Sequence, residues 1–157
     1  VCKKAKFLAV NAQSNSANMG YNFITKYPKA DYICIDEPEA RLALHDRTSE
    51  LEAIIRKLSA QLEARFVTIT RGNHGCMISS PETGFIGIPA LTNNVIDTVG
   101  AGDAFLSISS PCVAMGLPLE QCGFIGNAAG ALKVGIVGNR NSVEKGPLLK
   151  FLTTLLK

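Results

Sequence analysis

The sequence predicts an α/β fold in which helices flank a mostly parallel sheet. Short apolar runs and helical patterns alternate in the order strand, helix, strand, helix, strand, which is the order of a parallel sheet. Two further apolar runs around a Pro- and Gly-containing turn predict an antiparallel hairpin at one edge. The chain has 157 residues, 46% of them hydrophobic and 18% charged. It is therefore long and apolar enough to bury a core.

The first half of the chain supplies two buried strands. Phe7–Asn11 and Tyr32–Asp36 are short apolar runs that fit strands in the middle of a sheet. The small, polar segment Ala12–Gly20 between them predicts a loop. Pro38 suits the first turn of a helix, where its missing N–H is not needed, and this helix is expected to run through Ala40–Leu44.

The clearest helical pattern is Ser49–Arg65. Ser49 and Glu52 have the spacing of a capping box, in which each side chain caps a backbone N–H of the first turn. The β-branched run Phe66–Thr70 then predicts a strand. One face of the helix carries apolar side chains at helical spacing, namely Leu51, Ile54, Ile55, Leu58 and Leu62.

The second half predicts a hairpin followed by helices. Cys76–Ser79 and Phe85–Ile88 can pair around Pro81–Gly84. Pro111 is expected to kink or end the first helix of this half, because it lacks an N–H and clashes with the preceding turn. The helical patterns are Ala101–Met115, Leu119–Val134 and Pro147–Leu156.

Composition excludes several classes of protein. The net charge of +3 is too small and too scattered to predict binding to nucleic acid or to an anionic membrane surface. The longest uncharged run, Ala104–Leu119, is too short to span a bilayer. No secretory signal pattern is visible, so a cytoplasmic protein is expected. Five cysteines without paired spacing predict reduced, mostly buried thiols rather than disulfides or zinc: Cys2, Cys34, Cys76, Cys112 and Cys122.

A charge-poor stretch contains the candidate catalytic residues. Thr83–Leu132 holds only three charged residues, and two of them, Asp97 and Asp103, lie six apart. The segment Gly100–Gly102 precedes a predicted helix, where free N–H groups and the helix dipole can bind a phosphate. A carboxylate beside that site, Asp103, suits removal of a proton from an attacking hydroxyl. The alternative is a Gly-rich turn with Asp103 as an ordinary first-turn carboxylate.

The string Asp97–Phe105, DTVGAGDAF, resembles the D-T-x-G-A-G-D-x-F signature of the PfkB (ribokinase-like) carbohydrate kinases. The resemblance implies a ribokinase-like fold and ATP- and Mg²⁺-dependent transfer of a phosphoryl group to a sugar or sugar phosphate. It implies that Asp103 is the general base on the sugar hydroxyl. Gly100, Ala101 and Gly102 would form the anion hole for the transferred group.

Three further segments match the family in the same order. Asp36 and Glu39 stand where the family has N-x-x-E, which organises Mg²⁺ through water, with Asp in place of Asn. Two helix-start carboxylates are the alternative interpretation. Thr70, Gly72 and Gly75 match the T-x-G-x-x-G turn along the nucleotide, although a plain hairpin turn has the same pattern. The run Asn127-Ala128-Ala129 matches the helix beside the adenine pocket, and small residues also favour tight helix packing.

The segment Lys133–Ser142 resembles the loop that holds a monovalent cation beside the anion hole in ribokinase. The resemblance therefore implies a K⁺ site built mostly from backbone oxygens. Its expected ligands are Lys133, Ile136, Gly138 and Ser142, with Asp97 and Val99 completing the shell.

The resemblance covers only the C-terminal, nucleotide-binding half of the family's fold. We therefore expect residues 1–157 to be a partial kinase domain, without the N-terminal half that carries the lid and most sugar contacts, and poorly active alone. The polar run Asn11–Ser16 resembles kinases related to the heptose-phosphate kinase and cytidylyltransferase group. A full-length homodimer is also implied. The alternatives are a nucleoside kinase of the adenosine kinase type and a non-catalytic nucleotide-binding module.

Overall fold

The computed structural model describes residues 4–13, 17–92, 94–138 and 140–157. Part of the polar run Asn11–Ser16, namely residues 14–16, lies outside the described residues, as do Cys2 and the Asn139 of the predicted cation loop.

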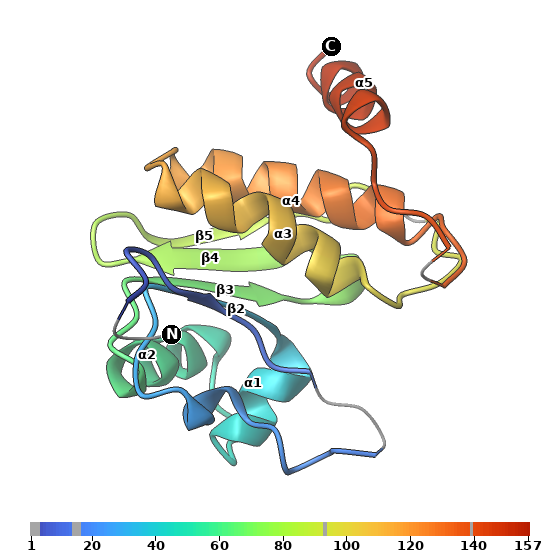
Figure 1. The fold of residues 1–157 in the computed structure, drawn as a ribbon. Helices are drawn as coiled ribbons and strands as arrows, with labels where there is room; N and C mark the ends of the chain where they lie inside the picture. The colour runs from blue at the N-terminus through green and yellow to red at the C-terminus, as the bar shows by residue number, and fades with distance from the viewer. Residues whose placement is uncertain (1–3, 14–16, 93, 139) are drawn as a thin grey trace.

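A five-stranded sheet forms the centre of the molecule, with its strands in sequence order (Figure 1). The first three strands pair in parallel, and the last two pairings are antiparallel. Four strands consequently run in one direction and β4 alone runs in the other. The predicted mostly parallel α/β sheet and its hairpin are confirmed. The strands are β1 (Ala9–Val10), β2 (Tyr32–Asp36), β3 (Phe66–Thr70), β4 (Cys76–Ser80) and β5 (Gly84–Ile88).

Helices cover both faces of the sheet (Figure 1). On one face lie α1 (Glu37–Ala43) and α2 (Leu51–Gln61), and on the other α3 (Ala101–Ala114) and α4 (Leu119–Lys133). The last helix, α5 (Lys145–Leu155), lies beyond α4. Short 3₁₀ turns occur at η1 (Ile24–Lys26) and η2 (Gly72–His74).

The side chains of β2 alternate between two cores, as the pleat of a strand requires. Ile33 and Ile35 pack in the core with α1 and α2, whereas Tyr32 and Cys34 pack in the core with α3 and α4. The predicted apolar face of α2 is buried in the first of these cores: Leu51, Ile54, Ile55, Leu58 and Leu62. Because alternate side chains of β2 enter different cores, both faces of the sheet are covered by apolar side chains.

Two local expectations are corrected. The capping box is absent, because Glu50 is the N-cap of α2 and makes no side-chain cap, while the Ser49 hydroxyl donates to Asp46. Of the two outcomes expected at Pro111, a kink or an end of the helix, the end does not occur, because α3 continues through Pro111 to Ala114. Burial of its neighbours, among them Val113, stabilises the last turn although Pro111 supplies no N–H.

The four cysteines that the structure describes are free thiols, and Cys34, Cys76 and Cys122 are buried. Among the described residues, no helix is long and apolar enough to cross a membrane.

Candidate active site

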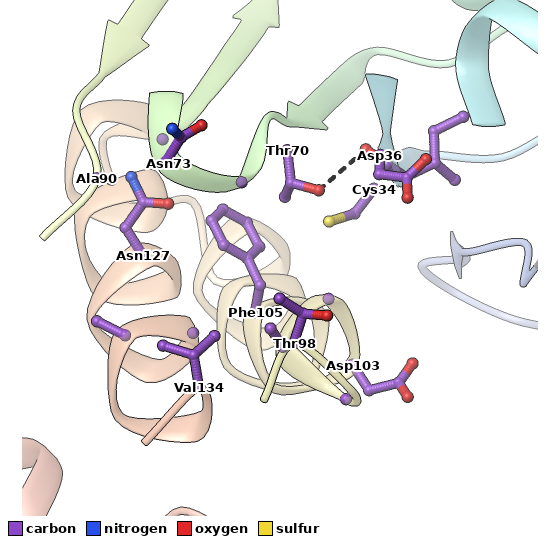
Figure 2. A pocket seen from close by; sticks show the side chains of 18 of the residues that line it. Cys34, Asp36, Thr70, Asn73, Ala90, Thr98, Asp103, Phe105, Asn127 and Val134 are labelled. Atoms are coloured by element: carbon purple, nitrogen blue, oxygen red, sulfur yellow. Dashed lines mark hydrogen bonds between the residues drawn. The ribbon is translucent and has the colours of Figure 1, made fainter. Parts of the chain in front are cut away.

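A cavity of about 420 Å³ opens at the carboxyl ends of β2 and β3 (Figure 2). Parallel sheets place loops at this edge, which is where ligands usually bind. Ten residues are predicted from the sequence to take part in catalysis, nucleotide binding or Mg²⁺ binding, and all ten line the cavity. They are Asp36, Glu39, Thr70, Gly72, Gly75, Gly100, Ala101, Gly102, Asp103 and Asn127. Figure 2 shows Asp36 and Asp103 on one side of the cavity and Asn73 and Asn127 on the other.

The N-terminus of α3 contributes the anion-binding candidates. Gly100 is the N-cap with φ +78°, a left-handed conformation that glycine adopts without strain. Ala101 is not the free donor that the sequence predicts, because its N–H donates to the Thr98 carbonyl at 3.2 Å. In the described part of the chain, the N–H groups of Gly100 and Gly102 have no such partner. Asp103 follows in the first turn and is exposed.

Asp36 has a structural role as well as a place in the cavity. It is the N-cap of α1, and its Oδ1 accepts the Glu39 N–H at 2.7 Å. The alternative of a helix-start carboxylate is therefore realised for Asp36. Partial exclusion of water raises the pKa of this carboxyl, and the hydrogen bond from Glu39 opposes that rise. Both carboxylates still line the cavity.

The turn after β3 is shaped by a glycine. Its ends are joined by the Arg71 N–H, which donates to the Gly75 carbonyl at 2.8 Å. Gly75 has φ +78°, and a Cβ there would lie 2.0 Å from the Ile88 carbonyl oxygen. Only glycine fits this turn against the end of β5. Thr70 begins the turn, with its hydroxyl 3.5 Å from the Ile35 carbonyl (Figure 2).

Asn127 on α4 fixes the segment that follows β5. Its amide nitrogen donates to the carbonyls of Ile88 at 3.3 Å and Pro89 at 3.1 Å. In Figure 2 that nitrogen turns toward Ala90 and the amide oxygen turns toward Phe105. The side chain thus holds one wall of the cavity in position and presents an acceptor to it.

The residues predicted to bind K⁺ lie outside the cavity lining. The Asp97 carboxylate accepts the N–H groups of Val99 at 2.9 Å and Gly138 at 2.7 Å. These hydrogen bonds, with the charge of Lys133, hold the pKa of Asp97 below its usual range. The Lys133 carbonyl accepts the Ile136 N–H at 2.9 Å. Ser142 is exposed on the loop beyond.

Sequence reasoning missed part of the lining. Cys34, Asn73, Ala90 and Thr92 also face the cavity. The pairing of β4 with both of its neighbours brings the end of β5 back to the edge where β2 and β3 end. That topology could have indicated Ala90 and Thr92, because they follow β5 directly.

A metal would find few ligands here. Within the described residues, no group of three or more His, Cys, Asp or Glu side chains could hold a metal ion. Asp36 and Glu39 still suit Mg²⁺, which commonly uses one or two carboxylates, water and substrate phosphates.

Comparison with known proteins defines the class. The sequence profile of the pfkB family carbohydrate kinases matches residues 1–146. Among solved structures, phosphofructokinase-2 from Escherichia coli in complex with potassium matches with a TM-score of 0.75 and 16% identity, over 95% of this chain and 47% of that one. The fold is that of the ribokinase-like kinases. The chain belongs to the pfkB family of carbohydrate kinases.

Two other matches are a curated relative and a second solved structure. The Bifunctional protein HldE of Methylococcus capsulatus is 33% identical over 90 residues, which are 57% of this chain and 19% of that protein. A nucleoside kinase from Burkholderia thailandensis, solved with inosine, is 27% identical with a TM-score of 0.63, over 80% of this chain and 40% of that one. The chain spans less than half the length of each solved kinase named above.

Proposed function

We propose that this chain carries the phosphate-transferring half of an ATP-dependent carbohydrate kinase, whose acceptor is a sugar or sugar phosphate. One observation carries the proposal: Asp103 and the N-terminus of α3 share a cavity with the turn after β3 and with Asn127. The proposed base, the proposed anion-binding N–H groups and the proposed nucleotide-binding turn therefore line the same cavity.

The proposed reaction uses the first turn of α3. Asp103 takes the proton of the acceptor hydroxyl while the oxygen of that hydroxyl bonds to the γ-phosphorus. The bond from the γ-phosphorus to the bridging oxygen breaks, and ADP leaves. The free N–H groups of Gly100 and Gly102, with the positive end of the helix dipole, stabilise the charge on the transferred group.

Mg²⁺ would be held through water by Asp36 and Glu39, beside the phosphates. When bound, the ion neutralises phosphate charge. Because Asp36 also caps α1, the same hydrogen bond that starts the helix fixes its carboxylate at the rim of the cavity.

We further propose that residues 1–157 form a partial kinase domain whose acceptor contacts come from other parts of a longer polypeptide. The chain spans 47% of phosphofructokinase-2, which supports this interpretation. Phosphoryl transfer requires both substrates to be positioned and water to be excluded. We therefore expect weak ATP binding and little turnover from the 157-residue chain.

Two alternatives to a sugar kinase are considered. A nucleoside kinase is favoured by the 27% identity to the Burkholderia enzyme solved with inosine. The other alternative is a nucleotide-binding module without catalysis, but such a module does not need the carboxylate of Asp103.

The test is Asp103→Asn, made in the 157-residue chain to measure ATP binding and in a longer polypeptide that contains it to measure turnover. Turnover is assayed by ADP release with sugars, sugar phosphates and nucleosides as acceptors, and ATP binding is measured by calorimetry. We expect the variant to lose about 10²–10⁴-fold in turnover with ATP affinity unchanged. Glu120→Gln, an exposed acid on α4, is the matched control. Equal turnover in Asp103→Asn and wild type contradicts the base assignment.

A further inference from the structure

Lys133, the last residue of α4, is an unusual side chain for its position. In the described part of the chain it is the only charged side chain that is buried, with 6% of its surface exposed. Buried ammonium groups are costly unless they are paired with acceptors. The Nζ of Lys133 donates to the carbonyl of Gly138 at 2.5 Å, which supplies such a partner.

The same carbonyl belongs to a small polar network. The N–H of Gly138 donates to Asp97, whose other carboxylate oxygen accepts from Val99. The Val134 carbonyl accepts the N–H groups of both Ile96 and Asp97. These contacts tie the loop after α4 to the segment that leads into Gly100, the N-cap of α3.

The residues present do not suit a K⁺ ion. Two carbonyls that the family resemblance assigns to the ion are already engaged, that of Gly138 by the ammonium and that of Lys133 by the Ile136 N–H. An ion within reach of the Gly138 oxygen would also stand beside a buried charge of the same sign. Like charges repel strongly where water is excluded.

We propose that the ammonium of Lys133 takes the place of the monovalent cation, so that the chain carries its own tethered cation and needs no K⁺. In this proposal the positive charge at the end of α4 binds the loop after α4 as an ion would. It thereby keeps that loop in contact with the segment around Asp97. Unlike a bound ion, it cannot dissociate or be exchanged.

The test uses thermal unfolding, which is independent of the proposed kinase activity. The wild-type protein is compared in KCl, NaCl and choline chloride at equal ionic strength. We expect the same melting temperature in all three salts, within about a degree. A melting temperature several degrees higher in KCl, or saturable K⁺ binding in calorimetry, would overturn the proposal.

Variants test whether the ammonium fills a cation site. Lys133→Met keeps much of the aliphatic stem and removes the charge, so we expect a lower melting temperature that KCl, but not choline chloride, raises by several degrees. Lys133→Arg keeps a charge and should stay insensitive to K⁺. Lys150→Met, on an exposed position of α5, is the matched control. A folded Lys133→Met variant with no response to K⁺ overturns the assignment; if it does not fold in any salt, the wild-type titration decides.

If this inference holds and a longer polypeptide is active, its turnover will not depend on K⁺. This expectation for turnover rests on the proposed function, whereas the unfolding experiments do not. A failure of the kinase assay therefore leaves the result for Lys133 standing.

Discussion

The side-chain amide of Asn127 donates a hydrogen bond to the carbonyl of Pro89, 38 residues earlier in the sequence. A second bond from the same nitrogen reaches Ile88. One side chain of α4 therefore holds the chain in place where β5 ends and the cavity wall begins.

Asn127→Ala is expected to loosen this wall. It removes the donor of two hydrogen bonds, one part-buried and one exposed, each of which contributes about 0.5–1.5 kcal/mol at most. We expect lower stability in urea unfolding and weaker ATP binding in calorimetry. Asn127→Asp is the sharper comparison, because a carboxylate accepts but cannot donate. Stability equal to wild type in both variants would contradict the structural role.

Gly126→Ala tests the packing between α3 and α4. A Cβ at Gly126 would lie 2.7 Å from the Phe105 ring, so the ring must move. Overpacking of this kind typically costs about 1–3 kcal/mol. Gly130→Ala on the same helix is the control, because its Cβ would meet nothing closer than the Ala101 carbonyl oxygen at 3.7 Å. There the gain in helix propensity, up to about 1 kcal/mol, should stabilise the protein.

Asp36 allows its observed capping role and its proposed metal-holding role to be separated. Asp36→Asn keeps a good N-cap, so the free energy of unfolding should change little, whereas Asp36→Ala should cost about 1 kcal/mol. Asn has nearly the shape of Asp but carries no charge, and one of its two polar atoms donates instead of accepting. We therefore expect Asp36→Asn to alter the Mg²⁺ dependence of ATP binding, measured by calorimetry across Mg²⁺ concentrations. If the Mg²⁺ dependence of ATP binding is unchanged in Asp36→Asn, the metal-holding role is contradicted and only the capping role remains.

Buried thiols predict a loss of stability in alkali. Burial raises the pKa of Cys34 and Cys76 from 9.0 to about 12. Above pH 9 the folded state therefore holds more protons than the unfolded chain, and the free energy of unfolding falls as pH rises. Each thiol contributes a slope of about 1.4 kcal/mol per pH unit at most. Urea unfolding between pH 8 and 10.5 should show a shallower slope in Cys34→Ala and Cys76→Ala, and identical slopes would refute the cause.

Much of the fold could be predicted because its patterns are local. The β-branched run Phe66–Thr70 is a strand with the predicted bounds, and α4 begins at Leu119 as expected. Both elements bury regular apolar patterns, which are visible in sequence. The Ser49 cap failed because Asp46, three residues earlier, competes for the same hydroxyl, and short polar side chains often have such alternatives.

The candidate site could be predicted only as separate pieces. The motif around Asp103 and the turn around Gly72 are each recognisable, but their meeting in one cavity depends on the pairing of β2 with β3 and of β4 with β5. The burial of Lys133 could not be foreseen, because no local pattern indicates that a loop carbonyl will fold back over its ammonium. Long-range contacts of single side chains decide both features.

The antiparallel course of β4 has a practical consequence for experiments. Val67, near the start of β3, pairs with Ser79, whereas Thr70, at its end, pairs with Cys76. The β4–β5 turn therefore lies at the opposite end of the strands from the turn around Gly72, which lines the cavity. A fluorophore or affinity tag attached at exposed Glu82 would therefore leave the cavity lining untouched.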